Sequence, residues 1–296
     1  MNTFLVRTYL FLIVFFISTP VLAAEKHIVF VSIEPQKYFV QEIGKDLIEV
    51  MVMVQPGANP ATYEPRASQM AALSKARLYF SIGVPFENTW LKKISAANPD
   101  ITMIHTDQGI QKIPMATFNE NADGSLKGHE DHGHEGLDPH IWLSPELVKV
   151  QAKIILKALK ELDPLHQAVY EKNFHNFITR IEKLDENLHY LFKTKKGLRF
   201  MVFHPSWGYF ANAYGLEQIP IEIEGKNPKP AQLNKLIRYA RNNNINIIFV
   251  QPQFSTKSAK LIAQEIKGHI VFADPLSGDW MINMWNVAQK FMEALK

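Results

Sequence analysis

Histidine and carboxylate residues suited to binding a metal ion occur at separate points along the chain. His140 lies in the segment Asp138-Pro139-His140, just before a helix that we expect to begin near Pro145. His204 directly follows an apolar, β-prone run, and Asp274 follows another. In open α/β sheets, ligands bind in the crevice outside the carboxyl ends of the strands. His140, His204 and Asp274 could therefore close a cleft around a single ion, although each histidine taken alone could equally be a packing residue.

A second cluster is local. The histidines His129, His132 and His134 alternate with acidic residues inside a polar, turn-rich segment, 116–137, that we expect to be an exposed loop. Short histidine-rich, acidic tracts can capture transition metals, and imidazole suits zinc, copper and nickel. The other interpretation is a solvated loop with chance histidines. Three of the chain's 11 histidines fall within six residues, which favours metal capture.

Composition limits the chemistry that is available. The chain has 296 residues and no cysteine, so any metal site must use histidine and carboxylate ligands, and the fold must rely on its core rather than on disulfides. No cysteine follows the leader to carry a lipid. The formal net charge of +3 is too small to indicate a nucleic-acid partner.

The first 23 residues are typical of a secretory signal peptide. Arg7 precedes a nearly continuous apolar run, Tyr9 to Ser18, and Val21-Leu22-Ala23 places small residues at the expected cleavage point after Ala23. An uncleaved membrane anchor is the alternative, but the run is shorter than the ~20 residues that a spanning helix needs. No later run is long and apolar enough to span a bilayer. We therefore expect an exported mature protein that is soluble and not embedded in the membrane.

The rest of the chain alternates between β-prone and helical segments, which indicates an α/β fold with parallel sheets. We expect an N-terminal lobe at 24–162, a linking helix at 163–195 and a C-terminal lobe at 196–296. The linking helix carries an apolar stripe at steps of three and four residues, from Phe174 to Leu191. A helix of ~30 residues is ~45 Å long, enough to act as a stiff spine along both lobes.

Several motifs in the same order resemble those of the substrate-binding proteins of zinc and manganese ABC transporters. The matching segments are Pro56 to Pro65 (Pro-Gly-Ala-Asn-Pro-Ala-Thr-Tyr-Glu-Pro), Asp138 to Pro145, His204 to Phe210, Ile221 to Lys226, Gln251 to Ser255 and Asp274 to Leu276. The resemblance covers essentially the whole mature chain. It implies two βα lobes joined by a rigid spine helix, with the metal site in the cleft between the lobes.

The resemblance also implies the metal ligands, which are His140, His204 and Asp274. One position departs from the family pattern, because Ala61 stands where the family normally carries a histidine. The fourth ligand position is therefore open to a water molecule, to a histidine of the 129–134 region or to Glu64. The other interpretation of Ala61 is a protein that has lost tight metal binding. Carboxylates next to the ligands should orient the imidazoles, and Glu222 and Glu224 lie two residues apart on a short strand-like run, so both side chains would point to the same face. Nitrogen-rich ligation favours Zn²⁺ over Mn²⁺, which prefers oxygen.

The function that the resemblance implies is capture of zinc in the periplasm and delivery to the permease and ATPase subunits of an ABC importer, by a monomeric binding protein. One alternative is a periplasmic zinc buffer or chaperone that docks on no permease. A zinc hydrolase is another, because two histidines, an aspartate and a water could form such a site. The sequence contains no His-Glu-x-x-His helix, no nucleophile motif and no phosphate-binding glycine loop. We therefore expect a binding protein and not an enzyme.

Overall fold

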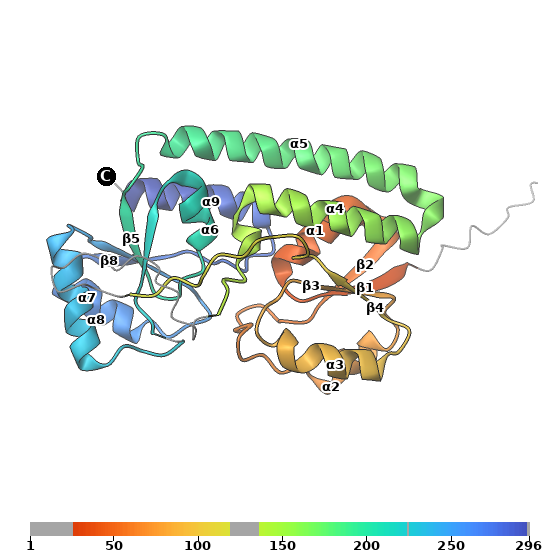
Figure 1. The fold of residues 1–296 in the computed structure, drawn as a ribbon, viewed down its shortest axis with the longest axis horizontal. Helices are drawn as coiled ribbons and strands as arrows, with labels where there is room; N and C mark the ends of the chain where they lie inside the picture. The colour runs from red at the N-terminus through yellow and green to blue at the C-terminus, as the bar shows by residue number, and fades with distance from the viewer. Residues whose placement is uncertain (1–25, 119–135, 224, 295–296) are drawn as a thin grey trace, which may run out of the picture.

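The computed structural model describes residues 26–118, 136–223 and 225–294. Within these ranges the chain forms two four-stranded parallel sheets with helices packed around them (Figure 1). The predicted two-lobed α/β fold is therefore confirmed. The predicted signal peptide and the histidines at 129, 132 and 134 lie outside the described residues.

The first lobe contains a sheet with the strand order β2-β1-β3-β4. Its strands are β1 (His27–Val31), β2 (Ile48–Val52), β3 (Leu78–Ser81) and β4 (Thr102–His105), and its helices are α1 (Glu34–Gly44), α2 (Ala67–Leu73) and α3 (Glu87–Ala97). Strand β1 is central and pairs with β2 on one side and β3 on the other, so the chain reverses its winding direction between β1 and β3. Such a reversal opens a crevice at the carboxyl ends of the two strands.

The second lobe repeats this arrangement with the order β6-β5-β7-β8. Its strands are β5 (Arg199–Val202), β6 (Glu217–Pro220), β7 (Ile247–Val250) and β8 (His269–Phe272), and its helices are α6 (Gly208–Tyr214), α7 (Pro230–Asn242), α8 (Lys257–Glu265) and α9 (Trp280–Ala294). The winding direction reverses between β5 and β7. Each lobe therefore presents a crevice at the carboxyl ends of its central strands.

Two long helices, α4 (Pro145–Leu162) and α5 (Gln167–Phe192), connect the lobes and pack against each other. The predicted spine helix is present as α5, which lies along the top of both lobes in Figure 1. It begins a few residues later than Asp163-Pro164 suggested, because Pro164–His166 form a separate 3₁₀ turn before it. The expected stripe is its core face, with Phe174, Phe177, Ile181, Leu184 and Leu188 all buried. The lobe boundaries at 162/163 and 195/196 stay a prediction.

One hydrophobic core continues through both lobes. It joins Phe30 of the first sheet to Phe200 of the second through the buried faces of α4, α5 and α9, and a smaller cluster lies beneath α7 and α8. The Trp142 indole donates to the Pro275 carbonyl at 2.7 Å, and the Trp280 indole donates to the Trp142 carbonyl at 2.7 Å. Close-packed cores resist continuous deformation. The shared core and these buried bonds therefore limit how far one lobe can move against the other.

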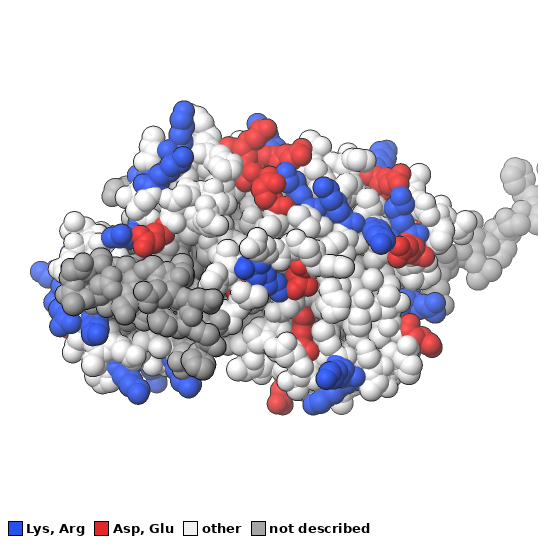
Figure 2. All heavy atoms as spheres, viewed as in Figure 1, with Lys and Arg blue, Asp and Glu red and all other residues white. Residues whose placement is uncertain are grey.

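Charged side chains of both signs are mixed over the outer face of α4 and α5 (Figure 2). Lys149 pairs with Glu146 at 2.7 Å, and Lys160 pairs with Glu171. This is the solvated side of the helix pair, opposite its apolar stripe. Among the described residues, no helix is long and apolar enough to cross a bilayer.

The short strand-like run expected at Glu222 and Glu224 is wrong. Strand β6 ends at Pro220, and Glu222 lies beyond it. The backbone of Glu222 still donates to the Phe203 carbonyl at 3.0 Å, but the ladder ends there because Ile223 pairs with Lys226 instead. Residue 224 is outside the described range.

Candidate metal centre

His140 is held in place by a buried carboxylate two residues earlier. The Asp138 Oδ1 atom accepts a hydrogen bond from the His140 backbone N at 2.8 Å and lies 2.7 Å from His140 Nδ1. Asp138 and His140 are 1% and 7% exposed. Because an ionised carboxylate can only accept, Nδ1 carries the proton and Nε2 keeps its lone pair for a metal ion. Burial lowers the pKa of His140, which favours the neutral, metal-binding form of the ring.

His204 is positioned in the same way from the second lobe. It follows β5, and its Nδ1 lies 2.7 Å from Oε1 of the buried Glu222. The side chain of Gln251 clamps the backbone, since its Oε1 accepts from His204 N at 3.2 Å and its Nε2 donates to His204 O at 2.6 Å. The ring of Phe254 stacks on the imidazole with centroids 4.6 Å apart. The lone pair of His204 Nε2 is therefore also available.

The two imidazoles meet across the lobes, with ring centroids 5.1 Å apart and planes inclined by 70°. Adding an imidazole radius of ~1.1 Å to a Zn–N bond of ~2.05 Å puts each centroid ~3.2 Å from a bound zinc ion. Two such ligands at a tetrahedral angle have centroids ~5.2 Å apart by the same geometry. The observed separation matches this value.

A small cavity of about 60 Å³ lies beside the two rings. Its walls include His140, His204, Ala61, Trp142, Gln253 and Phe254. A cavity of this size has room for an ion with a few coordinated atoms or for a few water molecules. Most of the wall is apolar, so a bound ion would be shielded from bulk water on several sides.

Asp274 lies next to this cavity and is not part of its wall. It follows β8, and its Oδ1 accepts from Gln253 Nε2 at 2.8 Å and from Leu276 N at 2.9 Å. Both of its side-chain hydrogen bonds within the described residues end on Oδ1. Across the described ranges, no three histidine, aspartate or glutamate side chains converge closely enough to hold an ion by themselves. The structure thus brings His140 and His204 together, whereas Asp274 lies behind the wall residue Gln253.

The structure also places the candidates for the open ligand position. Ala61 is in the cavity wall, where its methyl group offers no donor. Glu64 is exposed and outside that wall. His129, His132 and His134 lie outside the described residues. Of these candidates within the described residues, none offers a donor atom in the cavity wall.

Sequence reasoning missed most of the residues that position the ligands. Asp138 was seen as part of a motif, but its distance of two residues from His140 was the available signal for a carboxylate that orients the ring. Glu222 was expected to orient a ligand histidine, and its bond to His204 identifies which one. The roles of Gln251, Gln253 and Phe254 had no sequence signal beyond their location after a strand.

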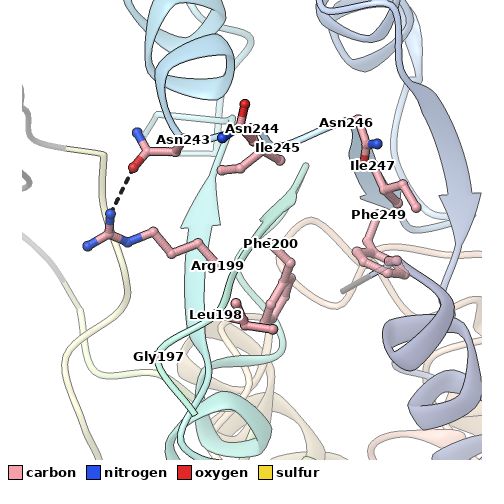
Figure 3. Close-up of a pocket in the computed structure, with 11 residues that line it drawn as sticks. Gly197, Leu198, Arg199, Phe200, Asn243, Asn244, Ile245, Asn246, Ile247 and Phe249 are labelled. Atoms are coloured by element: carbon pink, nitrogen blue, oxygen red, sulfur yellow. Dashed lines mark hydrogen bonds between the residues drawn. The ribbon is translucent and has the colours of Figure 1, made fainter. Parts of the chain in front are cut away.

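Another cavity of the second lobe lies away from the two imidazoles. It has a volume of about 310 Å³ and lies at the amino ends of β5 and β7, between Arg199, Phe200 and the loop Asn243 to Ile247 (Figure 3). Arg199 there points toward Asn243, to which it donates at 2.9 Å, and it pairs with Glu217 at 2.6 Å. This is the opposite end of the sheet from His204. Its one charged side chain is already paired, so it offers little for a ligand.

Comparison with known proteins identifies the family of the chain. The family model "Zinc-uptake complex component A periplasmic" (ZnuA) matches residues 29–294. The chain belongs to this family. A crystal structure of a ZnuA protein is 43% identical to this ZnuA-family chain, with a TM-score of 0.82, and the match covers 92% of this chain and 100% of that one. A zinc-bound deletion mutant of ZnuA also gives 43% identity and a TM-score of 0.82, covering 92% of this chain and 99% of that one. The high-affinity zinc uptake system protein ZnuA of Bacillus subtilis is 28% identical, over 82% of this chain and 76% of its own length.

Proposed function

We propose that this protein captures Zn²⁺ in the cleft between its lobes and delivers it to an ABC importer. The observation that carries the proposal is the pair of imidazoles at 5.1 Å, each held by its own buried carboxylate. A carboxylate on the far nitrogen of a metal-binding histidine sets the tautomer and raises the basicity of the donor atom. Family membership supports the same function, since similar proteins are zinc-uptake components.

The proposed ligands are His140 from the first lobe, and His204 and Asp274 from the second. Asp274 would bind through Oδ2, because its described hydrogen bonds end on Oδ1. Zinc is favoured over manganese because two of these donors are imidazole nitrogens. The lobes would close around the ion by a small motion only, because both share one core through α4, α5 and α9.

The setting that we propose is the periplasm, reached by cleavage of the signal peptide after Ala23. There the protein, as a monomer, would dock on the permease, while the ATPase subunit would supply the energy for import. We propose binding and delivery with no catalysis of its own. The histidines at 129–134 would capture zinc first, at a weaker site.

Competitive zinc titration of the purified mature protein tests the proposal. The parent is expected to bind one ion tightly, and His204→Ala is expected to lose most of that affinity. His269→Ala is the matched control, because His269 lies in the same lobe on an exposed position of β8. Equal zinc affinity in the parent and in His204→Ala would refute binding at the cleft.

A further inference from the structure

One residue of the cavity wall has a buried acceptor atom without a partner among the described residues. This residue is Gln253, and the Oε1 atom of its side chain is buried without any hydrogen bond from the described residues. Buried carbonyl oxygens in native proteins almost always have a partner, and an unpaired one costs free energy. The partner is therefore expected to be something that enters the cavity.

The orientation of this amide follows from its neighbour. Oxygen and nitrogen of a glutamine side chain are distinguished by their hydrogen bonds. The nearest group is the carboxylate of Asp274, which can only accept, so the amide nitrogen must face it, and the bond is 2.8 Å long. Asp274 is itself held by Leu276 N at 2.9 Å. The atom left free is thus the oxygen, which is the one atom of the amide that can bind a cation.

The position of Gln253 in the fold agrees with a role in binding. It follows β7, while His204 follows β5, and the crevice of the second sheet opens between these two strands. Residues on both sides of Gln253 contact His204. Gln251 hydrogen-bonds the backbone of the histidine, and Phe254 stacks on its ring. A short turn therefore fixes Gln253 and His204 relative to each other, beside a cavity of only about 60 Å³.

We propose that the Gln253 amide oxygen is a ligand of the bound ion and takes the position that Ala61 leaves open. Asp274 then also orients this amide, by accepting the hydrogen bond from Gln253 Nε2. The inference rests on the proposed zinc-binding function of the cleft. It gives two nitrogen donors from His140 and His204 and two oxygen donors from Gln253 and Asp274, and these four complete a zinc site when Asp274, which lies outside the cavity wall, moves toward the ion.

The donor set has a consequence for selectivity. An amide oxygen is neutral and harder than an imidazole nitrogen, so this site should discriminate less strongly between Zn²⁺ and oxygen-preferring ions than a site with three histidines. The amide also has no proton to lose, so one fewer ligand competes with protons for the metal.

Two substitutions test the assignment. Gln253→Leu has a similar size without the oxygen, and Gln253→Glu keeps a side-chain oxygen that can reach the ion but loses the hydrogen bond to Asp274. We expect Gln253→Leu to weaken zinc binding by at least about tenfold and to alter the visible absorption spectrum of the Co²⁺-substituted protein, which reports on ligand type and number. We expect Gln253→Glu to bind zinc at least about tenfold more tightly than Gln253→Leu.

The result that would overturn the inference is an unchanged zinc affinity and Co²⁺ spectrum in Gln253→Leu, or equal zinc affinity in the two variants. A purely structural role would lower the thermal stability of the metal-free protein and leave the Co²⁺ spectrum as in the parent. The parallel titration of His204→Ala keeps the two hypotheses apart. If His204→Ala loses zinc and Gln253→Leu does not, the cleft is the site and Gln253 is not a ligand.

Discussion

Replacing Gly208 with alanine tests whether the carboxylate of Asp138 orients His140, which we propose as a metal ligand. Gly208 is the first residue of α6, and it lies beside Asp138 without touching the cavity wall. A Cβ atom at this position would lie 2.8 Å from Asp138 Oδ2 and 3.6 Å from the side chain of Ile113. Alanine is otherwise favoured over glycine within helices. Any loss on substitution must therefore come from this contact.

The size of the effect follows from the geometry. An ordinary contact to a Cβ atom is 3.4 Å or more, so Oδ2 of Asp138 must move by about 0.6 Å. The carboxylate is rigid, so Oδ1, which holds His140 at 2.7 and 2.8 Å, moves with it. Disturbing a partner that orients a metal ligand typically costs 10- to 100-fold in affinity, or ~1.4–2.7 kcal/mol. Overpacking is expected to cost a further ~1–3 kcal/mol in the free energy of unfolding.

The assay is competitive zinc titration against a coloured chelator, together with urea unfolding of the metal-free protein. Gly136→Ala is the matched control, because a Cβ atom there meets no atom within 4 Å and the residue also lies close to Asp138 in sequence. We expect Gly208→Ala to bind zinc 10- to 100-fold more weakly than the control. Equal zinc affinities in the two variants would refute the reasoning that Asp138 orients His140.

Three further predictions concern other parts of the same lobes. Glu222→Gln should weaken zinc binding by ~10- to 100-fold, because a neutral amide holds His204 Nδ1 less firmly than a carboxylate, and an unchanged Kd would remove Glu222 from the site. Ala61→His should tighten zinc binding by at least about tenfold by adding an imidazole to the cavity wall, and a titration that shows no gain would mean that this position does not reach the ion. Glu87 is buried, and desolvation raises its pKa to about 7, so the folded state binds its proton more tightly than the unfolded state does. The stabilisation of the folded state by protonated Glu87 is complete below pH ~4.5 and is lost as the pH rises through 7. The loss amounts to about 3 kcal/mol in the free energy of unfolding. The difference in unfolding free energy between the parent and Glu87→Gln, measured in urea from pH 5 to 8, should follow this curve, and a constant difference would contradict it.

The general fold could be predicted because it depends on local patterns. Alternating β-prone and helical segments specify parallel sheets, and the stripe from Phe174 to Leu188 specifies a long helix with one buried face. The element ends were less accurate, as the later start of α5 and the early end of β6 show. Ends depend on which neighbouring strand or turn is available, and that information is not local.

The two candidate histidines could be selected from the sequence because the features that mark them are also local, and their role as metal ligands stays a prediction. Both His140 and His204 are marked by neighbouring residues, and the rule that ligands bind at the carboxyl ends of parallel strands applies to His204 directly. The absence of cysteine and the alanine at position 61 were likewise evident from the sequence, and they limit the site to nitrogen and oxygen donors.

The tertiary structure decided which residues the candidate ligands contact. The pairing of His204 with Glu222 spans 18 positions of the chain, and the contact between the His140 and His204 rings spans 64 positions and both lobes. The 2.8 Å bond that sets the orientation of the Gln253 amide depends on how β7 and β8 lie side by side. Sequence patterns report the backbone preference and polarity of each residue, whereas the distance between two side chains depends on packing across the whole core. The sequence therefore determined which kinds of atoms could bind an ion, and only the folded chain decided which of them face one another.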